Sequence, residues 1–355
     1  MIPGNFAKER DYSLNACLIR GLVQNATKAD VQEVGEVMID GAKGKQLEVR
    51  FRSGETKRID VYEAFWVDLV KRLSTENPRQ KLWRGLNLLI YWTFSKIWMA
   101  FRECPNTVLW SIITLILVTL WYYGTMAMGL TAIGMDPTFW GSALPKGWAA
   151  ELGELGELMG GWSVWVTIST LLAFVKVDLL VDSLDSTQRY LQDAIDETTG
   201  ESIRTKLRKR VMDTLEAVMA CQDYSRVTVI SHSFGAMIGV ELLAEVGNVG
   251  YPLAKPIRYI TLGGQLKVLA LRSPWVERAI AGCILNPAVE QWIDYYADGD
   301  WLCTQTPVRP DAGTKFEAKS IMREVPLWDA VTGKSHSYYF YEKEVIHQIL
   351  GVESV

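Results

Sequence analysis

The hydrophobic pattern of the chain is most regular between residues 226 and 244. Val227, Val229 and Ile230 belong to a β-branched run, which is typical of a buried strand. Apolar residues then recur at helical spacing, at Met237, Val240, Leu243 and Ala244. The residues between the two patterns read Ser231-His232-Ser233-Phe234-Gly235. The sequence therefore predicts a strand that turns sharply into a helix, with Ser233 at the turn.

Two long apolar stretches predict a pair of membrane-spanning helices. Residues 107–130 carry no charge and would form about 36 Å of helix, enough to cross a hydrocarbon core of about 30 Å. Residues 162–181 form a second candidate, interrupted near its end by Lys176 and Asp178. A third stretch, residues 82–101, is rich in aromatic residues but charged, and we expect it to lie along the membrane interface.

The order of these patterns predicts one α/β domain with a membrane insertion. Residues 1–80 and 182–355 would form the two parts of the domain, and residues 81–181 the insertion. Strands before and after the insertion must join one sheet, so the number of membrane crossings should be even. The 162–181 stretch could alternatively be a buried helix of the domain.

The charged residues indicate an orientation for this arrangement. Residues 71–106 hold seven basic and two acidic side chains, whereas residues 131–161 hold one basic and four acidic ones. Basic residues are enriched on the cytoplasmic side of membrane segments. We therefore expect a protein of the inner (cytoplasmic) membrane with its α/β domain in the cytoplasm.

Composition excludes several other classes of function. The net charge of −4 does not favour nucleic-acid binding. The five cysteines are odd in number and widely spaced, as expected of reduced thiols. Cys and His residues show no metal-ligand spacing, and no glycine-rich phosphate loop follows a strand. We expect neither a metal nor a cofactor.

A serine at a sharp strand-to-helix turn suggests nucleophilic catalysis, which needs a base and an acid to orient it. Of the three histidines, His232 lies inside the turn and His347 fits a helix surface, which leaves His336, after a polar loop, as the base. The acid should lie between Ser233 and His336 at the end of a strand. Asp300 is the first choice and Asp298 the alternative, because the acid commonly sits just beyond the strand.

With these residues the chain resembles the α/β-hydrolase superfamily, in particular its membrane-associated bacterial, lipase- or esterase-like members. The resemblance rests on residues 231–235, Asp300, residues 336–338 and residues 60–66. It implies a mostly parallel central sheet, with Ser233 as nucleophile, His336 as base and Asp300 as orienting acid. It further implies an oxyanion hole formed by the amide of Phe234 and a second amide after the first long strand. We place that strand at residues 14–20 and the second donor at Leu22.

These expectations combine into a membrane-anchored serine hydrolase that cleaves an ester or thioester through an acyl-enzyme. The substrate would be a lipid or an acylated small molecule or protein, and the bilayer itself would be a partner. Acyl transfer to an alcohol by the same triad is an alternative. A membrane-tethered binding or signalling module without catalysis is another. The sequence predicts no oligomeric state.

Overall fold

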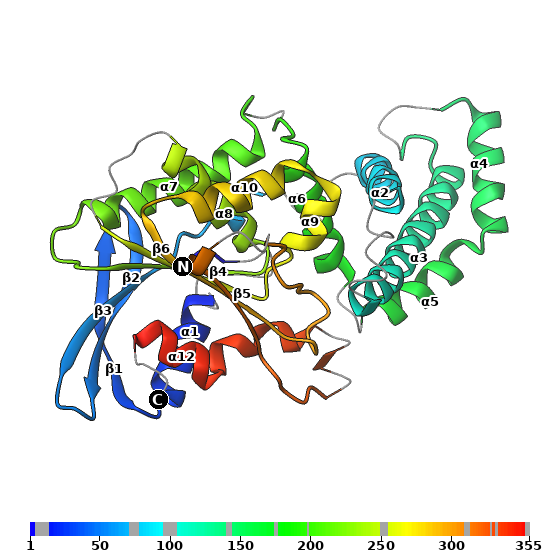
Figure 1. Cartoon of the computed structure of the whole chain (residues 1–355). Helices are drawn as coiled ribbons and strands as arrows, with labels where there is room; N and C mark the ends of the chain where they lie inside the picture. The colour runs from blue at the N-terminus through cyan, green and yellow to red at the C-terminus, as the bar shows by residue number, and fades with distance from the viewer. Residues whose placement is uncertain are drawn as a thin grey trace. The chain divides into compact units, whose positions relative to one another are not determined.

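The chain folds into two compact bodies, one formed by Met1–Val70 with Tyr190–Val355 and the other by Lys71–Arg189. The structure is a computed structural model, shown in Figure 1. It describes residues 1–3, 14–70, 78–94, 105–139, 144–173, 177–196, 199–248, 255–308, 313–326, 329–330 and 333–351. The boundaries between the bodies lie about ten residues from the positions 80/81 and 181/182 expected from the sequence.

A four-stranded parallel sheet organises the first body. Its order is β4 (Val227–His232), β5 (Ile257–Leu262), β6 (Val289–Tyr296) and β7 (Phe316–Ser320). Helix α8 (Gly235–Asn248) connects β4 to β5, and α9 (Leu266–Arg272) and α10 (Trp275–Leu285) connect β5 to β6. Nearly every residue of β4 and β5 is buried, as expected for parallel strands covered on both faces. The first body is therefore a mixed α/β structure, and the predicted strand-to-helix pattern around Ser233 is confirmed.

A separate three-stranded antiparallel sheet precedes it in the chain. Its strands are β1 (Ala29–Ile39), β2 (Ala42–Phe51) and β3 (Thr56–Tyr62), in that order. Asp40 and Gly41 form the two-residue turn between β1 and β2, both with positive φ, of 44° and 78°. An Asp-Gly pair favours this type of hairpin turn because both positions need the left-handed region.

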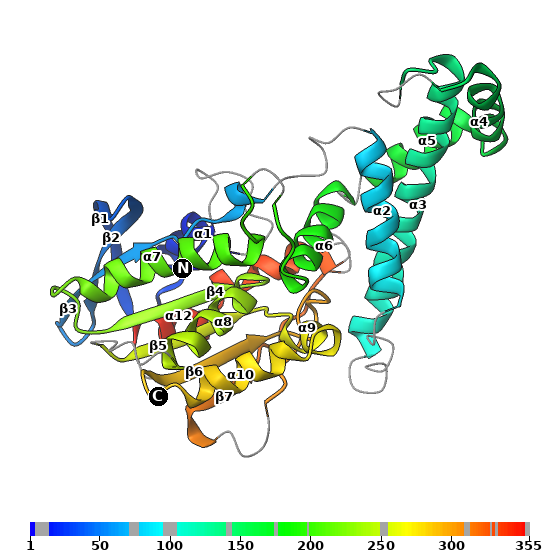
Figure 2. The ribbon, with the colours of Figure 1, turned by 90° about the horizontal axis from the view of Figure 1, so that it is seen from above.

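Helices cover both faces of the parallel sheet (Figures 1 and 2). On one face, α7 (Ile203–Ala220), α8 and α10 pack with Val227 and Val229 of β4. On the other face, α1 (Leu14–Asn25), the 3-10 helix η6 (Lys334–Tyr341) and α12 (Lys343–Leu350) pack with Ile230. Two further 3-10 helices in the described residues are η2 (Val67–Leu69) and η5 (Gly313–Lys315).

The strand predicted at residues 14–20 is wrong, because these residues begin helix α1. Leu18, Ile19 and Leu22 are buried in the core on one side of this helix. Their spacing of one, three and four residues is that of a helix face rather than the alternation of a half-buried strand.

The described elements of the second body are all helices. They are α2 (Pro78–Thr93), α3 (Pro105–Met135), α4 (Lys146–Leu158), α5 (Gly161–Ala173) and α6 (Val177–Leu191), whose last two residues belong to the first body. Within the described residues, one segment, Ser111–Met135, is long and apolar enough to cross a membrane, a test that the core helix of a soluble protein also passes. The predicted second span covers α5 and the start of α6, and residues 174–176 between them lie outside the described residues. The predicted interfacial segment begins in α2, and its part after residue 94 also lies outside them.

Glycines bring α3 and α4 into backbone contact. A Cβ atom on Gly153 would lie 2.6 Å from the Cα atom of Gly134, and one on Gly156 would lie 2.4 Å from the amide nitrogen of Thr131. Two glycines three residues apart lie on the same face of a helix and allow this close approach. The repeated Glu-Leu-Gly pattern of residues 151–158 is thus a helix-packing surface.

Candidate active site

Ser233 occupies the turn between β4 and α8 with a left-handed backbone. Its φ of 57° is one of three positive values at non-glycine residues among the described part of the chain. The turn is held at both sides, because the Ser233 amide donates to the carbonyl of Leu262 at 3.0 Å and its own carbonyl accepts from the Ala236 amide at 3.0 Å. Such strain at a single serine is a feature of functional turns.

Small residues around the turn are required by close neighbours. A Cβ atom on Gly235 would lie 2.4 Å from the carbonyl oxygen of Ile2. Ser231 stands where many such turns have glycine, and its Oγ atom would lie 2.6 Å from a Cβ atom on Gly239. The chain therefore accommodates the serine by having glycine on the facing turn of α8.

The side chains of the predicted base and the predicted acid are within hydrogen-bond distance of each other. His336 lies in η6, and its Nδ1 atom is 2.7 Å from Oδ2 of Asp300, 36 residues earlier in the chain. Both side chains are buried. Asp300 follows β6 in a turn closed by its own amide and the carbonyl of Ala297, at 3.1 Å. Asp300 thus lies on the loop beyond the strand, the position expected for the acid.

The three aspartates in this segment have different surroundings. Asp298, the alternative acid, is exposed. Asp294 lies inside β6, where it accepts hydrogen bonds from the Thr261 hydroxyl at 2.6 Å and the Thr306 amide at 2.8 Å. Burial raises the pKa of Asp294. Asp300 is the aspartate of this group that contacts the ring of His336.

Further donors keep Asp300 ionised. The Tyr339 hydroxyl donates to Oδ2 at 2.9 Å, and the Leu302 amide donates to Oδ1 at 3.1 Å. Burial opposes the charge of Asp300, but the charge of His336 and these hydrogen bonds outweigh it and lower its pKa below the ordinary value. A carboxylate held in this state orients and stabilises a protonated imidazole.

The end of β5 connects His336 to the turn at Ser233. A Cβ atom on Gly263 would lie 3.0 Å from Cε1 of His336, so the imidazole lies over this glycine. Gly263 directly follows Leu262, whose carbonyl accepts the Ser233 amide. Serine, histidine and aspartate are therefore gathered at the carboxyl ends of β4, β5 and β6, where ligands of open parallel sheets bind.

Two residues that the sequence did not single out hold this arrangement. His232 places its Nε2 atom 2.7 Å from the carbonyl oxygen of His336, with the two ring centroids 4.6 Å apart. A carbonyl only accepts, so Nε2 of His232 carries the proton. Burial, and then the charge of His336, lower the pKa of His232 to about 3, so its ring is neutral. Tyr339, the second residue, lies three positions after His336, which in a 3-10 helix is the same side.

Phe234 is enclosed by two aromatic side chains. Its ring meets those of Tyr190 and Trp66 edge-on, with centroids 5.2 Å and 5.9 Å away. The amides of Ala236 and Met237 are bonded to the carbonyls of Ser233 and Phe234. The Phe234 amide itself stands at the start of α8, where backbone donors lack acceptors within the helix. This position fits the oxyanion donor expected of it.

The second oxyanion donor was expected at Leu22 because a strand was predicted just before it, and that segment is a helix. Leu22 lies in the interior of α1, where a backbone amide donates to the carbonyl four residues earlier. At the edge of β4 that does not pair with β5, Ile2 forms a parallel bridge with Ser231. Residues 4–13, which follow that short pairing, lie outside the described residues.

Neither protein-family models, curated proteins nor solved structures give a significant match to this chain. Within the described residues, no group of three His, Cys, Asp or Glu side chains converges as a metal site requires. The geometry of the site is therefore the basis for any function of this protein.

Proposed function

We propose that this protein is a membrane-anchored serine hydrolase with an α/β-hydrolase fold, acting on esters or thioesters. The observation that carries the proposal is the buried contact of His336 Nδ1 with Asp300 Oδ2 at 2.7 Å, beside a serine with a φ of 57°. A strained serine, an imidazole and a buried carboxylate at one sheet edge are the components that acyl transfer needs.

Each residue then has a defined role. Ser233 Oγ attacks the carbonyl carbon of the substrate, and Nε2 of His336 takes its proton because Nδ1 is engaged by Asp300. The Phe234 amide stabilises the oxyanion of the tetrahedral intermediate. Collapse of the intermediate expels an alcohol or thiol, which receives the proton from His336 and leaves an acyl-serine. Water, activated by the same imidazole, releases the acid and restores Ser233.

Apolar stripes on the second body support its placement in a membrane. Leu109, Ile112, Ile116 and Leu120 follow one face of α3 and are 36–53% exposed. Trp83, Leu86 and Ile90 do the same on α2 at 36–74% exposure. Soluble proteins rarely leave contiguous apolar stripes in water. The segment Ser111–Met135, with a mean hydropathy of 1.6, is about 37 Å long as a helix.

Placement in the membrane favours a substrate of matching chemistry. An enzyme held at the bilayer encounters molecules that carry an acyl chain, so we propose a lipid or an acylated protein or small molecule as substrate. The charge distribution of residues 71–161 supports the inner membrane, with the first body in the cytoplasm.

Fluorophosphonate labelling of the purified full-length protein tests the catalytic part of the proposal. Mass spectrometry should locate the adduct on Ser233, and Ser233→Ala should abolish both labelling and ester hydrolysis. Ser231→Ala is the matched control, since this buried serine lies two residues away and should be dispensable for labelling. Labelling that survives Ser233→Ala would refute the proposal, and a protein that neither labels nor hydrolyses would be a binding module. Addition of an alcohol acceptor reports acyl transfer by diverting the product from acid to ester.

A further inference from the structure

The carboxylate of Asp300 receives three hydrogen-bond donors. Its Oδ2 atom accepts from the Tyr339 hydroxyl at 2.9 Å and from Nδ1 of His336 at 2.7 Å. Its Oδ1 atom accepts from the Leu302 amide at 3.1 Å. Each carboxylate oxygen has two lone-pair sites, so the phenol and the imidazole occupy both sites of Oδ2. The hydroxyl of Tyr339 and the ring of His336 are therefore coupled through a single oxygen atom.

Tyr339 and His336 share one scaffold. They are three residues apart in the 3-10 helix η6, which places them on the same side. Their rings are nearly perpendicular, at 89°, with centroids 6.4 Å apart. A Cβ atom on Gly263 would lie 2.8 Å from Cε2 of Tyr339 and 3.0 Å from Cε1 of His336. Both rings thus lie over the same glycine at the end of β5, and both are buried.

The hydroxyl of Tyr339 remains a donor to the carboxylate. Burial, and then the charge of Asp300, raise the pKa of Tyr339 well above its ordinary value, so the phenol keeps its proton. The same oxygen lies 3.2 Å from Sγ of Cys303. A carboxylate is the stronger acceptor because the bond is charge-assisted. The Cys303 thiol in turn donates to the carbonyl of Ala297 at 3.4 Å.

The other titratable groups near this bond have partners or carry no charge. They come from β4, β6 and the surrounding loops, and are His232, Asp294, Cys303, Arg323, Tyr338 and Glu342. The ring of His232 is neutral, because burial and the charge of His336 lower its pKa to about 3. Arg323 pairs with Glu342 at 2.6 Å. The phenol of Tyr339 is thus the side-chain hydroxyl that shares the charge of Asp300 with His336.

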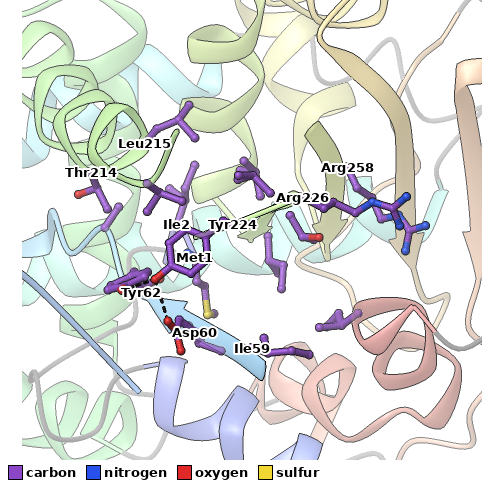
Figure 3. Close-up of a pocket in the computed structure, with 18 of the residues that line it drawn as sticks. Met1, Ile2, Ile59, Asp60, Tyr62, Thr214, Leu215, Tyr224, Arg226 and Arg258 are labelled. Atoms are coloured by element: carbon purple, nitrogen blue, oxygen red, sulfur yellow. Dashed lines mark hydrogen bonds between the residues drawn. The ribbon is translucent and has the colours of Figure 1, made fainter. Parts of the chain in front are cut away.

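A second tyrosine–aspartate pair lies at the other end of β4, in the cavity shown in Figure 3. There Tyr224 donates to the carboxylate of Asp60 at 2.7 Å, and Arg58 donates to the same carboxylate at 3.0 Å. Tyr224 precedes β4, whereas Ser233 follows it. An arginine never loses its proton, so the charge of Asp60 is balanced at every pH. The partner of Asp300 is a histidine, whose proton comes and goes in the proposed reaction.

We propose that Tyr339 is a positioning residue of the triad, whose hydroxyl fixes the carboxylate of Asp300 against the ring of His336 and limits how strongly that carboxylate holds the proton on the ring. The inference rests on the proposed function. Rotation of the carboxylate would break three hydrogen bonds at once, so the ring of His336 has a fixed partner. Without the phenol, the full charge of Asp300 would act on His336, which would then keep its proton to a higher pH.

The pH dependence of ester hydrolysis by the full-length protein in detergent gives the first test. Tyr339→Phe keeps the ring and removes the donor. Its kcat should fall by about tenfold with KM nearly unchanged, because the buried phenol acts through Asp300. The midpoint of the acid limb of the kcat/KM profile should rise by about 0.5 pH units or more. A loss of packing alone would lower the rate without moving this midpoint.

The low-field NMR resonance of the proton on Nδ1 of His336 gives a second test, which does not need activity. His336→Gln identifies this resonance by its loss. In Tyr339→Phe the resonance should move to lower field, since Oδ2 of Asp300 then accepts one donor instead of two. Fluorotyrosine at position 339 is a stronger donor and should move both the resonance and the midpoint in the opposite direction. It keeps the proposal testable even where Tyr339→Phe does not fold.

Tyr224→Phe is the matched control, because it removes the phenol donor of Asp60 at the far end of β4. It should leave the resonance and the midpoint unchanged. An active Tyr339→Phe variant with the native resonance and the native midpoint would overturn the role of Tyr339 and leave the hydrolase standing. A native protein that hydrolyses no ester would instead overturn the proposed function, and this inference with it.

Discussion

The ring of Tyr190 lies edge-on against the ring of Phe234, with centroids 5.2 Å apart. Tyr190 is the residue at which the chain re-enters the first body, and Phe234 is the neighbour of Ser233. Trp66, close to where the chain leaves that body, packs on the same phenyl ring. Both connections to the helical insertion therefore lie beside the residue whose amide we assign to the oxyanion.

Substitutions of Tyr190 should separate packing from hydrogen bonding. Tyr190→Phe keeps the ring but removes the hydrogen bond from its hydroxyl to Glu241 at 2.5 Å, so it should destabilise the fold by about 1–3 kcal/mol with turnover nearly unchanged. Tyr190→Leu also removes the edge-on contact and should lower kcat by about tenfold or more through displacement of the Phe234 amide. Thermal unfolding and ester hydrolysis measure the two effects. Equal turnover of both variants would mean that the aromatic contact does not position the site.

The acid proposed for the triad can be tested with two matched substitutions of aspartate by asparagine. Asp300→Asn should reduce kcat by about 10³-fold or more, because the neutral amide no longer stabilises the protonated ring of His336. Asp298→Asn changes an exposed side chain and should leave kcat within about twofold. The reverse ranking would move the acid by two positions. Single-turnover kinetics with a chromogenic ester distinguish the chemical step from substrate binding.

His232 should make the fold sensitive to acid. Burial, followed by the charge of His336, lowers its folded pKa from 6.5 to about 3, so the unfolded chain binds the proton more readily. The contribution of the neutral His232 ring to the free energy of unfolding is complete above pH 6.5. It falls by about 1.4 kcal/mol per pH unit as the pH drops from 6.5 towards 3. His232→Gln retains a donor for the His336 carbonyl without this titration. Denaturant unfolding between pH 7 and 4 should show a shallower pH dependence for the variant, and identical slopes would disprove the assignment.

Membrane orientation can be read from two exposed positions. In a background without cysteine, Trp148→Cys in α4 should react with an impermeant maleimide on intact cells, because the acidic segment 131–161 is expected outside. Met322→Cys in the first body, 95% exposed in the native chain, should react only after lysis. Reaction at both sites, or at neither, on intact cells would contradict the hairpin topology.

The parts of the site that the sequence predicted are those set by local pattern. The turn at Ser233 follows from a β-branched run, a small-residue motif and a helical run, all within a few residues. Asp300 and His336 were predicted from the chain order serine, acid, histidine, with the acid just beyond a strand. His232 and Tyr339 were missed because their contacts with His336 and Asp300 depend on how distant segments pack.

The errors at the start of the chain have a physical cause as well. The sequence predicts a strand from Leu14 because the segment is apolar and the resemblance to α/β-hydrolases implies a strand there. Its buried residues Leu18, Ile19 and Leu22 nevertheless share one helix face. The residue that does pair with β4, Ile2, lies in a stretch too short to show any periodicity. The compensation of Ser231 by Gly239 could be recognised only once α8 was seen to face β4.

The left-handed backbone of Ser233 sets the requirements of catalysis against those of stability. An L-residue resists a φ of 57° because its Cβ atom crowds the backbone, whereas glycine adopts this angle freely. Ser233→Gly should therefore unfold at a higher temperature than Ser233→Ala, which retains the Cβ atom. Under selection for thermostability alone, a directed-evolution experiment would drift towards glycine at this position and lose the nucleophile that we propose. A library screened for folding must consequently hold residue 233 fixed if it is to retain the proposed activity.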